Sequence, residues 1–161
     1  MTIRYAVPDD VPALSAVEAE CFPPAEAATA AEFAERVAHY GNHFWLMYDG
    51  DKLISFVDGF VTDDVDLTDE MYENAAMHNE NGAWQMIFGV NTLPAYRQHG
   101  YAGELIQEAI ADAKKQGRKG LVPTCKDRLV PYYAKFGFVD EGVTDKSTHG
   151  NVAWHQMRLT F

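Results

Sequence analysis

The spacing of hydrophobic positions changes several times along the chain, and each change predicts the boundary of a helix or a strand. Alternation over residues 2–7 predicts a first strand, and a helix is expected to start at Pro8-Asp9-Asp10 and to stop at Pro23-Pro24. Thr29 and Glu32 have the spacing of a capping box, in which each side chain accepts a hydrogen bond from the other residue's backbone N–H. This pair predicts the start of a second helix.

Strands dominate the middle and the end of the chain. The segments expected as further strands are residues 43–48, 53–61, 83–92, 120–124, 138–141 and 152–160. The turn Asp49-Gly50-Asp51 predicts that the first two of these segments form a β-hairpin, and the last two are expected to form a terminal hairpin.

Helical patterns separate these strands. Residues 66–77 predict a loop and a short helix, and the apolar stripe of residues 102–113 predicts a longer helix that ends at Gly117. Residues 129–136 predict a third helix, with Pro131 tolerated in its first turn. The order of elements is typical of a mixed sheet with helices on its faces, so we expect one domain of the α/β (mixed α+β) class over residues 1–161.

Composition supports an ordinary globular protein. The chain has 161 residues, of which 47% are hydrophobic and 23% are charged, and this length is enough to bury a core. No apolar run approaches the roughly 18–20 residues that cross a bilayer, and the N-terminus has no signal-peptide pattern. We therefore expect a cytoplasmic protein with no membrane partner.

Charge is unevenly distributed along the chain, which has a formal net charge of -11. No Lys or Arg occurs between Leu53 and Tyr96, whereas most basic residues lie from Arg97 onward. One interpretation is a solvated acidic face. The other is that an acidic half attracts a cationic amine and a basic half suits a phosphorylated cofactor. A chain with this much negative charge is a poor partner for nucleic acid.

No metal site is expected either, because Cys21 and Cys125 lack metal-ligand spacing.

A turn between an expected strand and an expected helix is the main candidate site. Gly100, Ala102 and Gly103 are small residues at the point where the helix starts. Backbone N–H groups and the positive end of the helix dipole meet there, which suits a pyrophosphate, and Gly100 permits close approach of a ligand. Such turns are also common as plain connections, so the pattern alone leaves both interpretations open.

Two blocks of sequence resemble a known family. Arg97-Gln98-His99-Gly100-Tyr101-Ala102 is similar to the Arg/Gln-x-x-Gly-x-Gly/Ala motif of the GNAT superfamily of N-acetyltransferases. Residues 125–138 and 53–59, together with Glu18 and Phe22, resemble the serotonin (arylalkylamine) N-acetyltransferase branch. The order of elements agrees with that superfamily over the whole chain.

The resemblance implies a fold and a cofactor. The sheet would be mostly antiparallel and splayed between its fourth and fifth strands, residues 83–92 and 120–124, with acetyl-CoA between them. A bulge in the first of these two strands would leave an N–H to polarise the thioester. The residues that would contact acetyl-CoA are Val90, Asn91, Thr92, Arg97, Gln98, His99, Gly100, Tyr101, Ala102, Gly103 and Tyr133. Those that would contact the substrate are Phe22, Pro24, Phe56 and Trp84.

Tyr133 falls where this branch places its general acid, which would protonate the departing CoA thiolate. Its spacing from Tyr132 and Phe136 is also typical of a packed aromatic cluster, and spacing alone favours packing. The match to the branch favours the catalytic role for Tyr133.

The chain departs from the branch at one point. The animal enzymes carry two histidines on the central strand that are thought to relay the amine's proton, and Met86 and Phe88 occupy those positions here. An alkylamine with a pKa near that of Lys, about 10.4, arrives protonated. Three routes remain open for loss of this proton. Glu18 could accept it through water, a carboxylate of the acidic region could do the same, or only the small fraction of amine that is already neutral could react. Five histidines are expected to be structural or solvent-facing: His39, His43, His99, His149 and His155.

The sequence therefore predicts an N-acetyltransferase that moves the acetyl group of acetyl-CoA to a small primary amine by direct attack in a ternary complex. The amine is expected to be arylalkylamine-like or a polyamine, and the protein a monomer or a homodimer. Two alternatives stay open: a non-catalytic module that binds or senses acyl-CoA, and a protein N-terminal or lysine acetyltransferase.

Overall fold

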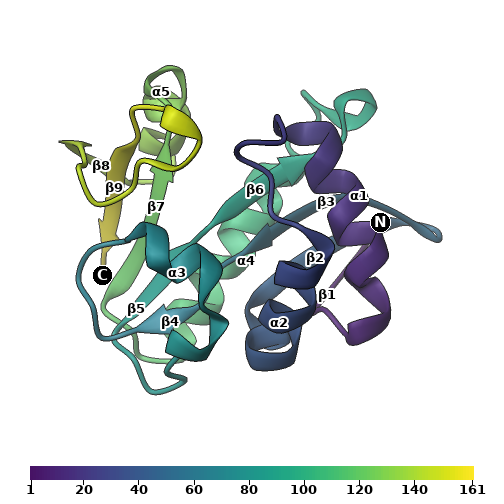
Figure 1. The fold of residues 1–161 in the computed structure, drawn as a ribbon, viewed down its shortest axis with the longest axis horizontal. Coiled ribbons are helices and arrows are strands. Elements are labelled where there is room, and N and C mark those ends of the chain that lie inside the picture. Colours follow the sequence, from purple (N-terminus) through teal and green to yellow (C-terminus); the bar gives the residue numbers. More distant parts are fainter. The chain divides into compact units, whose positions relative to one another are not determined.

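The computed structural model describes residues 1–161 and divides the chain into two compact units. Unit 1 consists of Met1–Gly59 and Gly89–Ala109, and unit 2 consists of Phe60–Phe88 and Ile110–Phe161. Each unit is therefore built from two separate stretches of chain. Each contains one sheet, and the elements can be followed by label in Figure 1.

Unit 1 has a four-stranded antiparallel sheet in the order β1-β2-β3-β6. Its strands are β1 (Thr2–Arg4), β2 (Phe44–Asp49), β3 (Lys52–Asp58) and β6 (Gly89–Thr92). Gly50 has a φ of 59° in the turn between β2 and β3, so the predicted hairpin is confirmed.

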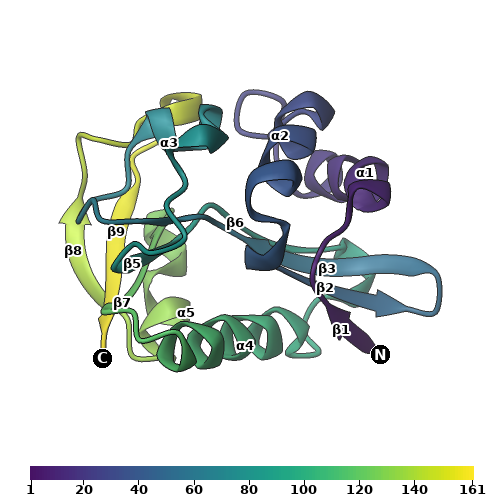
Figure 2. The ribbon, with the colours of Figure 1, turned by 90° about the horizontal axis from the view of Figure 1, so that it is seen from below.

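Two helices cover one face of this sheet, as Figure 2 shows. They are α1 (Val11–Cys21) and α2 (Ala30–Tyr40). The predicted capping box at the start of α2 is present: Thr29 Oγ1 accepts the N–H of Glu32 at 3.2 Å, and Glu32 Oε1 accepts the N–H of Thr29 at 3.0 Å. Phe33 of α2 packs edge-on against Phe44 and Phe56, which anchors this helix to the sheet.

The longest helix, α4 (Tyr101–Lys115), starts in unit 1 and ends in unit 2. Five members of the predicted apolar stripe are buried, Leu105, Ile106, Ala109, Ile110 and Ala113, whereas Ala102 at its start is half-buried. Gly117 follows the helix with a φ of 75°, a conformation that favours glycine at a helix end. None of the helices is both long and apolar enough to span a lipid bilayer.

Unit 2 has a five-stranded sheet in the order β4-β5-β7-β9-β8, in which only β5 and β7 are parallel. Its strands are β4 (Val61–Thr62), β5 (Trp84–Ile87), β7 (Gly120–Cys125), β8 (Val139–Val143) and β9 (His155–Thr160). Its short helices are α3 (Asp69–Glu73) and α5 (Val130–Ala134). The terminal hairpin and the short helix near residue 70 are confirmed.

Several predicted boundaries were wrong. The strand predicted at residues 83–92 is two strands, because β5 pairs with β4 and β7 whereas β6 pairs with β3. Pairing between the predicted fourth and fifth strands is thus limited to β5 and β7. The strand predicted at residues 53–61 is likewise divided into β3 and β4. The helix predicted at residues 129–136 spans only α5, since the chain reverses at Gly137, which has a φ of 95°.

The start of the chain also differs from the prediction. The first strand ends at Arg4 rather than at residue 7. The Arg4 guanidinium forms two hydrogen bonds to the Asp10 carboxylate, at 2.8 and 2.9 Å, and the N–H of Val7 donates to the same carboxylate at 2.8 Å. These bonds turn the chain away from the sheet and into α1.

Candidate active site

The turn that precedes α4 has the geometry that the sequence predicts. Gly100 has a φ of 79° and Gln98 a φ of 66°, so the chain is left-handed at both positions. The Gly100 carbonyl accepts the N–H of Glu104 at 3.0 Å, the first hydrogen bond of the helix. Gly100 is exposed, and a Cβ built there would meet nothing within 4 Å. The backbone is therefore open to a ligand at this point of unit 1.

The residues around this turn are accessible. Arg97, His99 and Gly100 are exposed, as predicted for His99, and residues 101–103 are half-buried. The His99 ring stacks on Tyr101 with a centroid separation of 5.5 Å. Arg97 Nε donates to the Thr92 carbonyl at 3.0 Å, which ties the turn to the end of β6.

The strand residues expected to contact the cofactor already have partners within unit 1. The Thr92 carbonyl also accepts from Cys21 Sγ at 3.4 Å, and the Asn91 carbonyl accepts from Ser55 Oγ at 2.6 Å. A pantetheine amide would share these carbonyls with the protein. The contacts predicted for Val90, Asn91 and Thr92 stay predictions.

A cluster of polar groups converges on Gly89 at the start of β6. A Cβ built on Gly89 would lie 3.0 Å from Asp58 Oδ1, 3.1 Å from Asn91 Nδ2 and 3.6 Å from Glu18 Oε1. Arg36 Nη1 donates to Asp58 Oδ2 at 3.1 Å, so the cluster holds two carboxylates and one guanidinium. Any side chain at residue 89 would press on these groups, which explains the glycine.

Both carboxyl groups of this Gly89 cluster are buried, and burial raises their pKa values. The pKa of Glu18 rises from its usual 4.5 to about 7, through burial first and the charge of Asp58 second. The N–H of Ala28, which donates to Glu18 Oε2 at 2.8 Å, opposes this rise. The pKa of Asp58 rises to about 6 through burial, against the opposing charge of Arg36.

These raised pKa values predict a pH-dependent stability. Because Glu18 binds its proton more tightly in the folded than in the unfolded state, its contribution is fully present below pH 4.5 and is lost as the pH rises through about 7. The free energy of unfolding should fall by at most about 1.4 kcal/mol per pH unit for each such group. Glu18→Gln should make this fall shallower, which urea denaturation at a series of pH values measures.

Glu20→Gln is the matched control for this prediction, since Glu20 lies on the same helix and is exposed. It should keep the pH dependence of the wild type. An unchanged slope in Glu18→Gln would contradict the prediction and would mean that Glu18 titrates alike in the folded and unfolded states.

Tyr133 lies in unit 2, within the single turn of α5. Its ring is 6% exposed and packs edge-on against Tyr132 and Phe138, with centroid separations of 5.4 and 6.0 Å. Burial raises the pKa of its phenol well above the usual value, and the nearby Cys125, Tyr132 and Tyr72 act in the same direction. The phenol therefore keeps its proton at neutral pH.

A second aromatic cluster of unit 2 was missed by the sequence analysis. Tyr72 of α3 lies 4.8 Å from Phe88 and 4.4 Å from His149, measured between ring centroids, and its hydroxyl is 2.9 Å from Thr124 Oγ1. His149 stacks on Trp154 at 4.3 Å. No local pattern marks these residues, because their neighbours come from four distant segments.

The predicted substrate residues fall into two groups. Phe56 is fully buried against Phe33 at 5.7 Å, and Trp84 lies beneath the Arg158 guanidinium at 4.5 Å. Their rings are in packing contacts. Phe22 is half-buried just after α1, and Pro24 is exposed.

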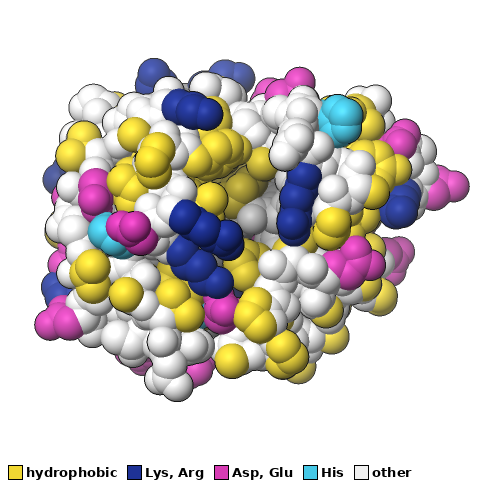
Figure 3. All heavy atoms as spheres, turned by 90° about the horizontal axis from the view of Figure 1, so that it is seen from above, with side chains coloured by type: hydrophobic (Ala, Val, Ile, Leu, Met, Phe, Trp, Pro, Cys, Tyr) yellow, Lys and Arg dark blue, Asp and Glu magenta, His cyan; other side chains and the backbone are white.

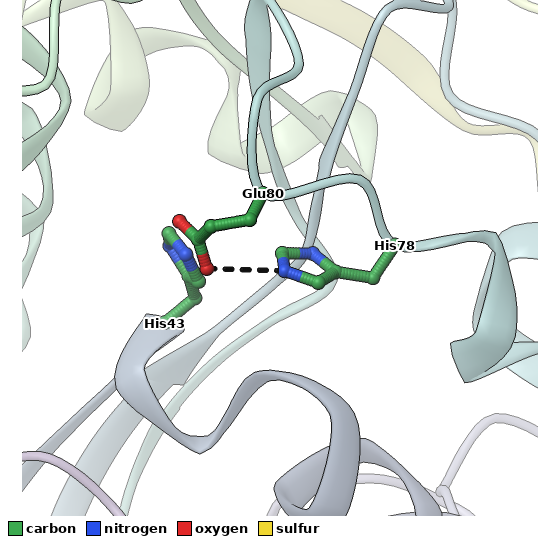
Figure 4. A group of neighbouring side chains, drawn as sticks. All are labelled: His43, His78 and Glu80. Atoms are coloured by element: carbon green, nitrogen blue, oxygen red, sulfur yellow. Dashed lines mark hydrogen bonds and ion pairs between the residues drawn. The ribbon is translucent and has the colours of Figure 1, made fainter.

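The acidic run of residues 58–80 is partly paired with cations of the protein. Asp66 forms ion pairs with Lys146 and Arg158. Glu80 contacts Arg118 at 2.9 Å and Nε2 of His78 at 3.2 Å, the contact drawn in Figure 4. Figure 3 shows exposed Asp and Glu side chains (magenta) and exposed Lys and Arg side chains (dark blue). This pairing weakens the long-range attraction that the sequence suggested for a cationic amine.

Comparisons with known proteins place this geometry in context. The sequence model of the acetyltransferase (GNAT) family matches residues 11–138. No curated protein sequence matches the chain significantly. Three solved structures, each under 25% identical, share its fold.

The GphF GNAT-like decarboxylase in complex with isobutyryl-CoA has a TM-score of 0.84 and 20% identity, over 99% of each chain. The loading GNATL domain of CurA from Lyngbya majuscula has a TM-score of 0.85 and 14% identity, over 99% of this chain and 96% of that one. A GNAT family acetyltransferase from Brucella melitensis in complex with acetyl-CoA has a TM-score of 0.63 and 19% identity, over 99% of this chain and 87% of that one. These likenesses confirm the predicted fold class.

Proposed function

The chain belongs to the GNAT family of acetyltransferases, and on that premise we propose that it transfers the acetyl group of acetyl-CoA to a small primary amine. The observation that carries this proposal is the open backbone at Gly100, directly before α4. The acetyl-CoA complex of the Brucella melitensis acetyltransferase, a protein of the same fold, supports the choice of cofactor.

Acetyl-CoA binding is assigned to the turn of residues 98–103. The first N–H groups of a helix have no partner within the helix, and the helix dipole favours an anion at that end. The pyrophosphate of CoA supplies such an anion. Arg97 is exposed beside the turn and adds a positive charge.

The chemistry is proposed as direct attack of the amine nitrogen on the thioester carbonyl. The C–N bond forms, the C–S bond breaks, and Tyr133 gives its proton to the CoA thiolate. Because burial makes the Tyr133 phenolate unfavourable, the phenolate takes a proton from the amine nitrogen as that nitrogen becomes an amide. Tyr133 then starts the next cycle protonated.

An arylalkylamine is the favoured substrate class over a polyamine. A polyamine would need several unpaired carboxylates, whereas Asp66 and Glu80 of the acidic run already contact cations of the protein. Phe22 and Pro24 remain the proposed contacts to the apolar part of the amine, since neither is held in the core.

Release of CoA thiol from acetyl-CoA tests the proposal. The panel contains 2-phenylethylamine, spermidine, an N-terminal peptide and an acetylation-blocked peptide with one internal lysine. We expect release with 2-phenylethylamine and formation of its N-acetyl product by mass spectrometry. Release only with a peptide would favour a protein acetyltransferase. Acetyl-CoA binding without release for any amine would favour the non-catalytic module.

Decarboxylation of an acyl-CoA is a second candidate function. The solved structure of GphF is described as a GNAT-like decarboxylase. Decarboxylation involves no amine proton, so it does not need the two histidines that Met86 and Phe88 replace. Carbon dioxide release from malonyl-CoA in the absence of amine would support it. Absence of that release, together with amine acetylation, would exclude it.

A further inference from the structure

The proposed reaction needs a group that removes a proton from the ammonium form of the amine. Met86 and Phe88 offer no basic atom, and the Glu18 carboxylate already accepts the N–H of Ala28. Unit 2 contains a histidine, His149, whose ring is contacted by two polar side chains and two aromatic rings: Asp69, Ser147, Tyr72 and Trp154.

The first neighbour of His149 is the carboxylate of Asp69, at the start of α3. Asp69 Oδ1 lies 3.3 Å from His149 Nδ1. Asp69 is itself fixed by the N–H of Thr148 at 2.9 and 3.0 Å, by Thr148 Oγ1 at 3.1 Å and by Ser147 Oγ at 3.2 Å. Burial alone would raise the pKa of Asp69, but these hydrogen bonds outweigh it and lower that pKa, so the carboxylate is charged.

The two aromatic neighbours, Trp154 and Tyr72, contact the imidazole ring itself. Trp154 stacks on His149 with an interplanar angle of 18°, and Tyr72 lies 4.4 Å away on a tilted plane. Trp154 Nε1 also donates to the His149 carbonyl at 2.9 Å, so Trp154 contacts both the ring and the backbone of His149. The imidazole therefore has little freedom to rotate.

Two oxygens face His149 Nδ1 at 3.3 Å, Asp69 Oδ1 and Ser147 Oγ. In the tautomer whose Nδ1 donates to the Asp69 carboxylate, the lone pair lies at Nε2. The carboxylate also stabilises the imidazolium that forms when Nε2 takes up a proton. A histidine oriented by a carboxylate in this manner is the usual construction of a general base.

His149 lies in the same part of unit 2 as the proposed general acid. Tyr72 contacts the His149 ring, and its hydroxyl contacts Thr124 Oγ1. Tyr72 is also among the groups that raise the pKa of Tyr133. Tyr72 thus links His149 to β7, the strand that ends at Cys125, and Cys125 is another group that raises the pKa of Tyr133.

We propose that His149 accepts the proton of the amine substrate at Nε2 and that Asp69 is its positioning residue. This assignment rests on the proposed acetyl transfer to an amine. The ammonium R–NH3⁺ gives one proton to Nε2, and the neutral amine then attacks the thioester. The CoA thiolate takes the Tyr133 proton, the second nitrogen proton returns to Tyr133, and the imidazolium releases its proton to water. One proton leaves per acetyl group transferred.

A matched pair of substrates tests the role of His149. At pH 7 2-phenylethylamine is almost wholly protonated, because its pKa is near that of Lys, about 10.4. Its 2,2-difluoro analogue has nearly the same shape, but the fluorines make it far less basic, so much of it arrives neutral. In single-turnover experiments His149→Gln should lose on the order of a hundredfold in rate with 2-phenylethylamine. With the difluoro analogue its rate should stay close to that of the wild type.

His155→Gln is the control, because His155 also contacts two carboxylates, Asp127 and Asp140, but lacks the aromatic neighbours. It should leave both rates unchanged. Equal loss of both rates in His149→Gln would overturn the proposal and indicate a structural role, as would an unchanged rate with 2-phenylethylamine. If Glu18→Gln instead shows the selective loss, Glu18 is the base and the proposal is wrong.

Asp69→Asn provides a second measurement that does not require loss of the imidazole. Removing the carboxylate should move the acidic limb of the rate profile to lower pH, because the imidazolium loses its stabilising charge. Two other titratable groups lie near the imidazole: Tyr72 contacts the ring, and Lys126 lies over Trp154 at 5.9 Å. Asp69→Asn leaves both unchanged. An unmoved limb would count against Asp69 as the positioning residue. If the wild type acetylates no amine, the proposed function fails, and the role of His149 fails with it.

Discussion

Tyr133→Phe should lower the single-turnover rate on the order of a hundredfold while leaving the affinity for acetyl-CoA nearly unchanged. The substitution removes one hydroxyl and keeps the ring, so the edge-on contacts to Tyr132 and Phe138 survive. The CoA thiolate would then depart without a proton donor. Single turnover is the appropriate measurement, because slow product release would otherwise hide a defect in the chemical step.

The pH profile gives this prediction a second readout. Because burial raises the pKa of Tyr133 above its usual value, the wild type should show no alkaline decline from this phenol near its usual pKa of about 10. Tyr132→Phe is the matched control, since Tyr132 is the adjacent and more exposed tyrosine. Full chemical-step activity in Tyr133→Phe would show that both tyrosines serve only in packing.

Gly100→Val should weaken acetyl-CoA binding at least tenfold. A Cβ at Gly100 meets no protein atom within 4 Å, so the valine would extend into the space that we assign to the CoA pyrophosphate. Loss of one charge-assisted hydrogen bond to the pyrophosphate is worth about 1.5–3 kcal/mol, which corresponds to roughly a tenfold to hundredfold change in Kd. Titration calorimetry with CoA measures the change.

Gly117→Val separates ligand contact from backbone strain. Gly117 has a φ of 75° and an equally open Cβ position. Both variants should lose stability to a similar extent, about 1–2 kcal/mol, because valine is disfavoured in the left-handed conformation. Only Gly100→Val should lose affinity for CoA. Similar affinities in the two variants would show that CoA binds elsewhere.

The features that the sequence predicted well are those set by neighbouring residues. The Thr29–Glu32 capping box and the glycine turns at Gly50 and Gly100 each depend on a few consecutive positions. The apolar stripe of α4 is equally local, because one helical period defines it. The family motif near Gly100 belongs to the same class, which is why the cofactor site was the easiest part of the function to propose.

The features that the sequence could not predict depend on partners far away in the chain. Residues 83–92 are mostly apolar, and only the different partners of β5 and β6 show that the strand divides near Phe88. His149 and Asp69 are 80 positions apart, so no spacing pattern joins them. Sequence reasoning therefore treated His149 as structural. The carboxyls of Glu18 and Asp58 likewise reveal their raised pKa values only through tertiary burial.

The division of each unit into two stretches of chain has a consequence for synthesis on the ribosome. When residue 59 has emerged, β3 still lacks its partner β6, which lies 30 residues further on. The nascent chain thus presents an unpaired strand edge while residues 60–88 are being made, and such edges invite pairing with other chains. We expect this interval to be the period when chaperones protect the protein, and we expect fragments that end before β6 to aggregate.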